Sequence, residues 1–290
     1  MLIDLRYHLT SLVAVFLALA VGILVGSSFI GGSSVKGLEE EFVKLRTDIH
    51  IQQRAAENLR EQIKKHSEFG EAAAPVLVKG RLPWRRVAII QTGDYSEAAQ
   101  SAKSILEEAG AKVVSVTTLA NLDSESAKEQ IIRAVELITG ETEAEDPVGR
   151  LLEIVADCVA AGSNPEALDI LERKGLLSKA GDYGQRVFRV VLIGGDRQKE
   201  SKRAQHIDLV LIDKLKAAGV VTLIGAEPVD AVTSYIPAYH RKSIPTVDDV
   251  NLAMGKVALV FAVAGEQGNF GVKKSADRVA PRFFETGKWQ

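Results

Sequence analysis

Residues 9–30 read LTSLVAVFLALAVGILVGSSFI, and no side chain in this stretch carries a charge. A helix rises about 1.5 Å per residue, so about 20 apolar residues span the roughly 30 Å hydrocarbon core of a bilayer. Because lipid offers the backbone no hydrogen-bonding partners, the stretch is predicted to be a transmembrane helix. Residues 1–8 form a short tail before it, and the chain that follows is then held at a membrane surface.

A cleaved signal peptide is the alternative interpretation of this stretch. Its apolar run exceeds the usual length of about 7–15 residues, which favours an uncleaved anchor, although Gly26 and Ser27 would suit a peptidase. Charge does not decide the orientation, because Arg6 lies on one side while Lys36 and Lys44 lie on the other, next to a run of glutamates.

Small residues recur at every fourth position of the anchor, at Ala14, Ala18, Gly22 and Gly26. On a helix they share one face, and small residues at this spacing let two membrane helices approach closely. Alanine and glycine are also common in single membrane helices. The regular spacing favours a helix-packing face and therefore a pair of anchors.

Residues 36–70 are predicted to form a coiled-coil helix. Its seam follows the a and d positions of a heptad repeat: Leu38, Phe42, Leu45, Ile49, Gln52, Ala56, Leu59 and Ile63. In a parallel dimer Glu41 of one helix would pair with Arg46 of the other, and Gln52 would fix the register of the two helices. The alternative is an amphipathic helix packed on its own domain. Together with the anchor, the seam favours a homodimer.

The globular part is predicted for residues 75–290, because Pro75 is expected to end the preceding helix. One pattern occurs twice in it: strands 86–91 and 112–117 flank helix 95–109, and strands 189–193 and 220–224 flank helix 202–218. Such units build parallel sheets. The predicted fold class is therefore α/β, with a mostly parallel, Rossmann-like or flavodoxin-like sheet and a helical insert at about 123–179.

Two further stretches complete the globular part. Residues 234–251 contain two prolines and are predicted to form a loop. Residues 251–264 are apolar but interrupted by Lys256, and they are too short to span a bilayer, so a buried core helix is expected.

The composition excludes several classes of protein. The formal net charge of −2 gives no electrostatic footprint for nucleic acid. Cys158 stands alone, so a disulfide framework and zinc-type spacings are absent, and we expect this thiol to be buried. The glycine turns after the strands lack nucleotide-binding spacing, and hydrolase motifs are missing. The sequence therefore predicts a protein that is not an enzyme.

Acidic residues follow three of the predicted strands, at Asp94, Asp196 and Glu227. Open α/β sheets bind ligands at the carboxyl ends of their strands, so these side chains form a candidate ligand rim for a cation or a ligand hydroxyl. The alternative is that each carboxylate only caps the helix that follows.

Two stretches resemble a known family. Residues 3–26 (IDLRYHLTSLVAVFLALAVGILVG), and TVDDVN at 246–251 followed by GKVALVFAVAGEQGNFGVKKSADRVAP at 255–281, resemble the bacterial copper transport family named after mycobacterial copper transport protein B (MctB). GLLSKAGDY at 175–183 agrees as well. The resemblance implies one anchor, a coiled coil and an α/β domain outside the cytoplasm. It also implies a role in copper homeostasis or efflux, and mycobacterial members are proposed to form an envelope channel.

The sequence contains few side chains that could bind copper. Copper(I) prefers thiolates and thioethers, and the chain has only Cys158, Met1 and Met254, in unrelated places. No cofactor and no direct copper site are therefore predicted.

Three hypotheses about function follow. The first is a dimeric, anchored copper protein whose partners are membrane lipid and envelope or transport proteins. The second is an envelope scaffold. The third is an anchored ligand-binding or enzymatic domain that uses the rim.

Overall fold

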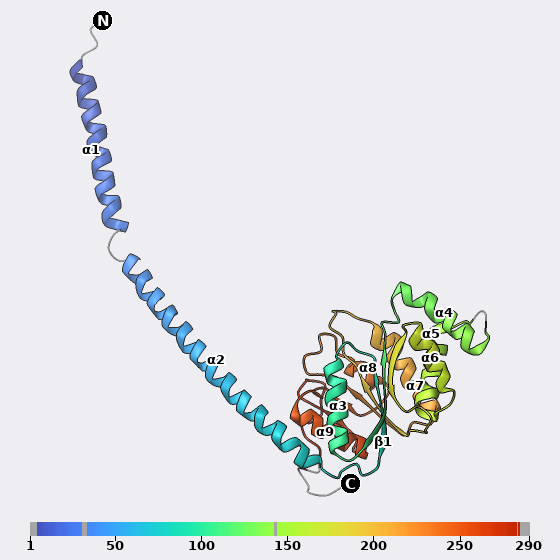
Figure 1. The fold of residues 1–290 in the computed structure, drawn as a ribbon. Coiled ribbons are helices and arrows are strands. Elements are labelled where there is room, and N and C mark those ends of the chain that lie inside the picture. The colour runs from blue at the N-terminus through green and yellow to red at the C-terminus, as the bar shows by residue number, and fades with distance from the viewer. Residues whose placement is uncertain (1–4, 31–33, 142–143, 283, 285–290) are drawn as a thin grey trace. The chain divides into compact units, whose positions relative to one another are not determined.

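The computed structural model describes residues 5–30, 34–141, 144–282 and 284, and for residues 5–6, 28–30 and 34–39 it describes the backbone only. The chain divides into two units, Met1–Lys65 and His66–Gln290. Two long helices precede the sheet: α1 (Leu5–Ile30) and α2 (Ser34–Val78) (Figure 1).

Helix α1 confirms the apolar helix predicted for residues 9–30. Its stretch Tyr7–Ser27 has a mean hydropathy of 2.6 and is long and apolar enough to cross a membrane, and none of it is buried within the chain. The helix lies near the N-terminus, where a signal sequence can also be long and apolar enough to meet this criterion.

Helix α2 runs farther than predicted. It begins at Ser34, two residues before the predicted start at residue 36, and its expected end at Pro75 is wrong, because the helix continues to Val78. A proline inside a helix removes one backbone hydrogen bond. Ala74 and Val78, on either side of Pro75, are buried in the core of the second unit. Their burial offsets the lost bond.

The second unit is built on one seven-stranded sheet, which confirms the α/β prediction. In the order β3-β2-β1-β4-β5-β6-β7, β3 is antiparallel to β2 and all other neighbours are parallel. The strands span Arg86–Gln91 (β1), Lys112–Leu119 (β2), Leu177–Gly181 (β3), Arg189–Ile193 (β4), Thr222–Ala226 (β5), Thr246–Val247 (β6) and Asn269–Phe270 (β7). This order places a topological switch point between β1 and β4.

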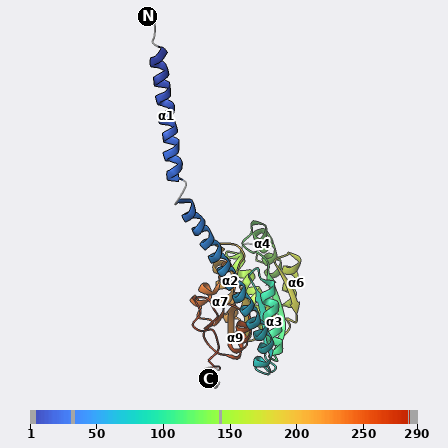
Figure 2. The ribbon, with the colours of Figure 1, turned by 90° about the vertical axis from the view of Figure 1, so that its left-hand side faces the viewer.

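Helices cover both faces of the sheet, as Figures 1 and 2 show. Val87 and Ile89 of β1 belong to the core on the face covered by α3 (Ser96–Glu108), α9 (Ala253–Ala264) and the end of α2. Ala88 and Ile90 belong to the core on the other face. The helices of that face are α4 (Glu125–Thr139), α5 (Pro147–Ala156), α6 (Pro165–Arg173), α7 (Leu209–Ala217) and α8 (Ile236–Arg241), with π-helical turns η1 (Asp157–Ala161) and η2 (Ala204–Asp208).

The core of the second unit is complete within residues 66–290. Ala74 is the first buried apolar residue of the described chain, and residues 40–69 contribute none. We therefore expect a fragment of residues 66–290 to fold on its own. Cys158 is buried in this core, as expected, and burial raises the pKa of its thiol to about 12.

Candidate functional site

The switch point between β1 and β4 is closed by backbone contacts. Both strands end in a glycine turn, TGD after β1 and GGD after β4. The amides of Thr92 and Gly93 donate to the carbonyl of Ile193 at 2.9 and 3.1 Å, and the Asp94 amide donates to the carbonyl of Gly195 at 3.0 Å. A Cβ atom on Gly93 would lie 2.2 Å from the Gly195 oxygen. Only glycine allows this approach, and the approach fills the place where related folds hold a ligand.

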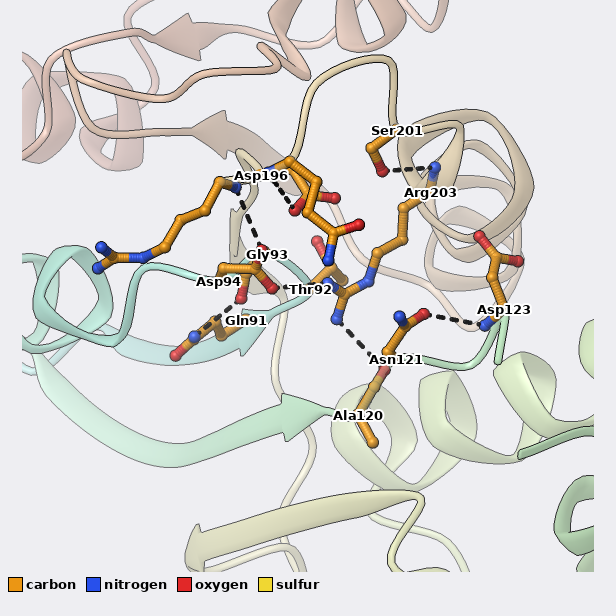
Figure 3. A network of polar contacts seen from close by, with 12 residues as sticks. Gln91, Thr92, Gly93, Asp94, Ala120, Asn121, Asp123, Asp196, Ser201 and Arg203 are labelled. Carbon is orange, nitrogen blue, oxygen red and sulfur yellow. Dashed lines mark hydrogen bonds and ion pairs between the residues drawn. The ribbon is translucent and has the colours of Figure 1, made fainter. Parts of the chain in front are cut away.

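A buried arginine joins the ends of strands β1 and β2 beside these turns (Figure 3). Arg203, whose side chain is 7% exposed, donates from Nη1 to Asp94 Oδ1 at 2.9 Å and from Nη2 to the carbonyl of Ala120 at 3.3 Å. The second oxygen of Asp94 accepts the amide of Arg197 at 3.2 Å. The carboxylate of Asp94 is therefore engaged within the protein on both of its oxygens.

The other two predicted rim residues meet through a tyrosine. The amide of Tyr235 donates to Glu227 Oε2 at 2.7 Å, and its hydroxyl donates to Asp196 Oδ2 at 3.3 Å. Glu227 is fully buried and also accepts the Ser234 hydroxyl at 2.6 Å and the Lys273 ammonium at 2.5 Å. The structure thus gathers Asp94, Asp196 and Glu227 around the carboxyl ends of the strands, where each has partners within the protein.

The ionisation of Asp196 is set by this network. Burial opposes it, but hydrogen bonds with Asp94, Ser201 and the Gln198 amide, together with the charge of Arg203, outweigh burial and lower the pKa of Asp196. A carboxylate at the strand end is therefore kept charged by its neighbours and does not depend on a bound cation for its charge.

Sequence reasoning missed Asp208, which lies beneath the rim. Its Oδ2 accepts the hydroxyls of Thr92 at 2.7 Å and Tyr239 at 2.5 Å, while its buried Oδ1 has no hydrogen-bond partner in the described chain. Burial raises the pKa of Asp208 to about 7, although both hydroxyls and the charge of Arg203 act against it. An aspartate within the apolar sequence IDLVLI was the signal that could have revealed it.

We expect Asp208 to make stability depend on pH. An unfolded aspartate titrates at about 3.9. The folded protein therefore binds more protons between about pH 4 and pH 7, and the stability that protonated Asp208 contributes is complete below this window and lost as pH rises through it. Asp208→Asn does not titrate. Its free energy of unfolding relative to the native fragment should therefore rise across the window by on the order of 1–3 kcal/mol.

Urea unfolding of fragment 66–290 at about pH 5 and about pH 7.5 measures this difference. Burial and the charge of Asp248 also raise the pKa of Asp249 to about 7, so both Asp208 and Asp249 contribute to the pH dependence of the native fragment. The difference between the native fragment and Asp208→Asn gives the contribution of Asp208 alone. Asp182→Asn, at an exposed carboxylate, corrects for the general effect of removing a charge. A difference independent of pH would show that Asp208 is already ionised in the folded protein.

Two surface grooves lie away from the rim. One surface groove of about 670 Å³ is lined by the end of α2, by α3 and by Lys256 of α9, whose ammonium pairs with Glu71 at 2.6 Å. A second, of about 640 Å³, lies beside Asn121 and Arg173. In the described ranges no three His, Cys, Asp or Glu side chains are grouped to hold a metal ion. The rim as folded ties strand ends together.

The residues predicted to pair two chains lie on the first two helices. Ala14, Ala18, Gly22 and Gly26 are on α1, and a Cβ atom at Gly22 or Gly26 would meet nothing within 4 Å. On α2 the seam from Phe42 to Ile63 is exposed throughout, and Phe42 itself is 61% exposed. The side chain of Leu38 lies outside the described residues. Pairing through either face stays a prediction.

Comparison with known proteins finds the same relatives along nearly the whole chain. A family model described as copper transport outer membrane protein, MctB, matches residues 2–281. The copper transporters MctB of Mycobacterium bovis and of two Mycobacterium tuberculosis strains are each 24% identical over 307 residues, which cover 95% of this chain and 98% of the relative.

Proposed function

Because this chain belongs to the MctB family of copper transport outer membrane proteins, we propose that it is an envelope protein of copper homeostasis or efflux, anchored through α1. The α/β domain then lies outside the cytoplasm, and the protein acts as a dimer without enzymatic activity. The family match over residues 2–281 is the observation that carries this proposal.

Copper is proposed to be handled together with partner proteins of the envelope or of a transport system. Copper(I) binds thiolates and thioethers, but Cys158 is buried and burial keeps the pKa of its thiol at about 12, so a thiolate is not available at neutral pH. Met254 on α9 is 45% exposed and is the other soft side chain of the described residues. Neither residue supports a copper site within one chain.

The absence of enzymatic activity is proposed from the strand ends. A general acid or base must reach a substrate proton. Asp94 and Glu227 are each held by a cation, and Asp208 is buried beneath the rim. These contacts support a structural role for the carboxylates of the switch point.

The exposed seam of α2 also favours a second candidate function, that of an envelope scaffold that organises partners through its coiled coil. The two candidates differ in what loss of the protein does to copper tolerance. Deletion of the gene is expected to make cells more sensitive to copper, and the full chain should restore tolerance, whereas fragment 66–290, which lacks the anchor, should not. Growth across a copper series measures this.

Zinc and iron series serve as matched controls for general envelope damage. Copper tolerance unchanged by deletion contradicts the copper role and leaves the scaffold. Equal sensitivity to all three metals also contradicts it, because a leaky envelope admits every ion. Protease digestion of intact and opened cells then tests on which side of the membrane the domain lies.

A further inference from the structure

The amino-terminal edge of the sheet carries a row of cations. Strands β1, β2, β4 and β5 are parallel, so they begin at one edge, and the register pairs Arg86 with Lys112 and Arg189 with Thr222. The strand starts and the loops before them place five cations at this edge: Arg85, Arg86, Lys112, Arg186 and Arg189. This edge lies opposite the rim described above.

These five cations form no ion pair with any residue that the structure describes. Burial and the charge of Arg85 lower the pKa of the Arg189 guanidinium, whose buried Nε has no hydrogen-bond partner in the described chain. Arg86 donates to Gln185 Oε1 at 2.6 Å. The exposed Asp182 lies nearby in the sequence, but its carboxylate accepts Gln185 Nε2 at 2.9 Å. The five cations outnumber this one carboxylate, and no ion pair within the described chain neutralises them.

Three apolar side chains stand among the cations. Trp84 is 92% exposed, Val221 is 80% exposed and Phe188 is 43% exposed. Phe188 and Val221 are neighbours, because the Val221 amide donates to the Phe188 carbonyl at 2.9 Å, and the Arg186 guanidinium lies 5.6 Å from the centroid of the Phe188 ring. We call the five cations and these three apolar side chains the basic edge.

The fold holds Trp84 in this exposed position. Its backbone has φ of 60°, in the left-handed region that bulky residues rarely adopt. The Trp84 amide donates to the Gly110 carbonyl at 3.1 Å, and the next amide, of Arg85, donates to the Leu82 carbonyl at 3.2 Å. Leu82 is fully buried. The loop is therefore fixed to the core, and it displays its indole to solvent.

We propose that the basic edge docks the α/β domain on an anionic lipid surface. Clustered arginines and lysines are attracted to anionic headgroups, and tryptophan favours the boundary between headgroups and acyl chains. An acidic peptide would pair with the cations, but it would leave Trp84 and Val221 in water. A lipid interface accommodates both kinds of side chain. The proposal is independent of the role in copper handling.

Binding of fragment 66–290 to vesicles tests the proposal without the anchor. Trp289→Phe leaves Trp84 as the single tryptophan, so its fluorescence reports the edge alone. We expect binding to phosphatidylcholine vesicles that contain about one third phosphatidylglycerol, with a blue shift of the emission, and release at high salt. Arg85→Glu with Arg86→Glu should weaken partitioning by a factor on the order of 30 or more. Trp84→Ala should weaken it less.

Lys199→Glu with Lys202→Glu is the matched control, because it makes the same charge change at exposed lysines beyond the carboxyl end of β4. This variant should bind anionic vesicles nearly as well as the parent. No binding to anionic vesicles, or equal loss in both double variants, overturns the proposal. Binding to a poly-glutamate peptide without binding to vesicles overturns it too, and would assign the edge to an acidic protein. Circular dichroism confirms that each variant is folded.

Discussion

Lys273→Met is expected to destabilise fragment 66–290 by about 3–5 kcal/mol, the usual cost of removing one partner of a buried ion pair. Glu227 is 0% exposed, and Lys273 supplies the cation at 2.5 Å. Methionine keeps most of the aliphatic length of lysine but leaves the buried carboxyl group of Glu227 without its counter-ion. The Lys273 ammonium also donates to the Pro228 carbonyl at 3.2 Å, a bond that is lost as well.

A double-mutant cycle with Glu227→Gln separates the charge from the packing. Glutamine retains one acceptor oxygen, which can take the Tyr235 amide, while its amide nitrogen can donate to the Ser234 hydroxyl, and it needs no cation. The double variant should therefore unfold with a smaller loss than Lys273→Met alone, and the difference is the coupling energy of the pair. Lys274→Met, at the exposed neighbouring position, should change stability by less than about 0.5 kcal/mol. A cycle without coupling would show that the ion pair contributes nothing to the fold.

The contact between Glu227 and Lys273 also shows which feature of the site could not be predicted from the sequence, namely the partners of the carboxylates. Carboxylates that follow parallel strands can be placed at one edge of a sheet, because topology fixes which ends meet. Lys273 lies 46 residues further along the chain, in a segment with no strand or helix pattern that would place it beside Glu227. Arg203 and Asp94 are 109 residues apart. Partners so distant depend on tertiary packing, and no local pattern records them.

The strands that could be predicted are those whose pattern is local. Strands β1 and β4 have the predicted bounds, because each is a buried β-branched run that ends in a glycine turn. Strand β5 begins at Thr222 rather than Val220, since Val221 is β-branched but exposed at the edge. The predicted helical insert also included β3, whose sequence LSKAG has no β-branched residue and forms a strand through its pairing with β2.

One loop prediction was wrong for a different reason. Residues 234–251 contain prolines, yet α8 occupies Ile236–Arg241 within this stretch. Proline at the start of a helix replaces an amide that has no helical partner, so Pro237 suits this position. Tyr235 and Tyr239 then lie one turn apart, and Tyr235 donates to Asp196 of the rim while Tyr239 donates to Asp208 beneath it. Pro237, which the sequence predicts to lie in a loop, instead lies in the first turn of the helix that supplies these two tyrosines.

Replacing Ile49 and Ile63 with aspartate should separate a dimer into single chains. Both residues occupy a positions of the predicted seam and are exposed in the single chain, where Ile63 is 59% exposed. Each dimer of this variant would bury four carboxylates between two helices. Burying unpaired charges costs several kcal/mol each, so the dissociation constant should rise by more than about 100-fold.

Cysteine cross-linking of the full chain in its membrane measures this change. Gln52→Cys places a thiol at a d position, where the two helices of a parallel coiled coil bring identical residues together. Oxidation should therefore form a disulfide dimer. Arg54→Cys, on the outer face of the same helix, should not cross-link. The buried Cys158 does not interfere with either thiol. The aspartate variant should then lose the disulfide formed at position 52.

Two apolar residues off the seam provide a control for the general effect of adding aspartates to this helix. Val43 and Ile51 are apolar, similarly exposed at 64% and 59%, and lie off the seam at b and c positions. Val43→Asp with Ile51→Asp adds the same charges to the same helix and should leave the disulfide intact. If this pair abolishes the dimer and the seam pair does not, the helices meet through another face. If neither does, α2 does not hold two chains together, and the dimeric part of the proposed function is wrong.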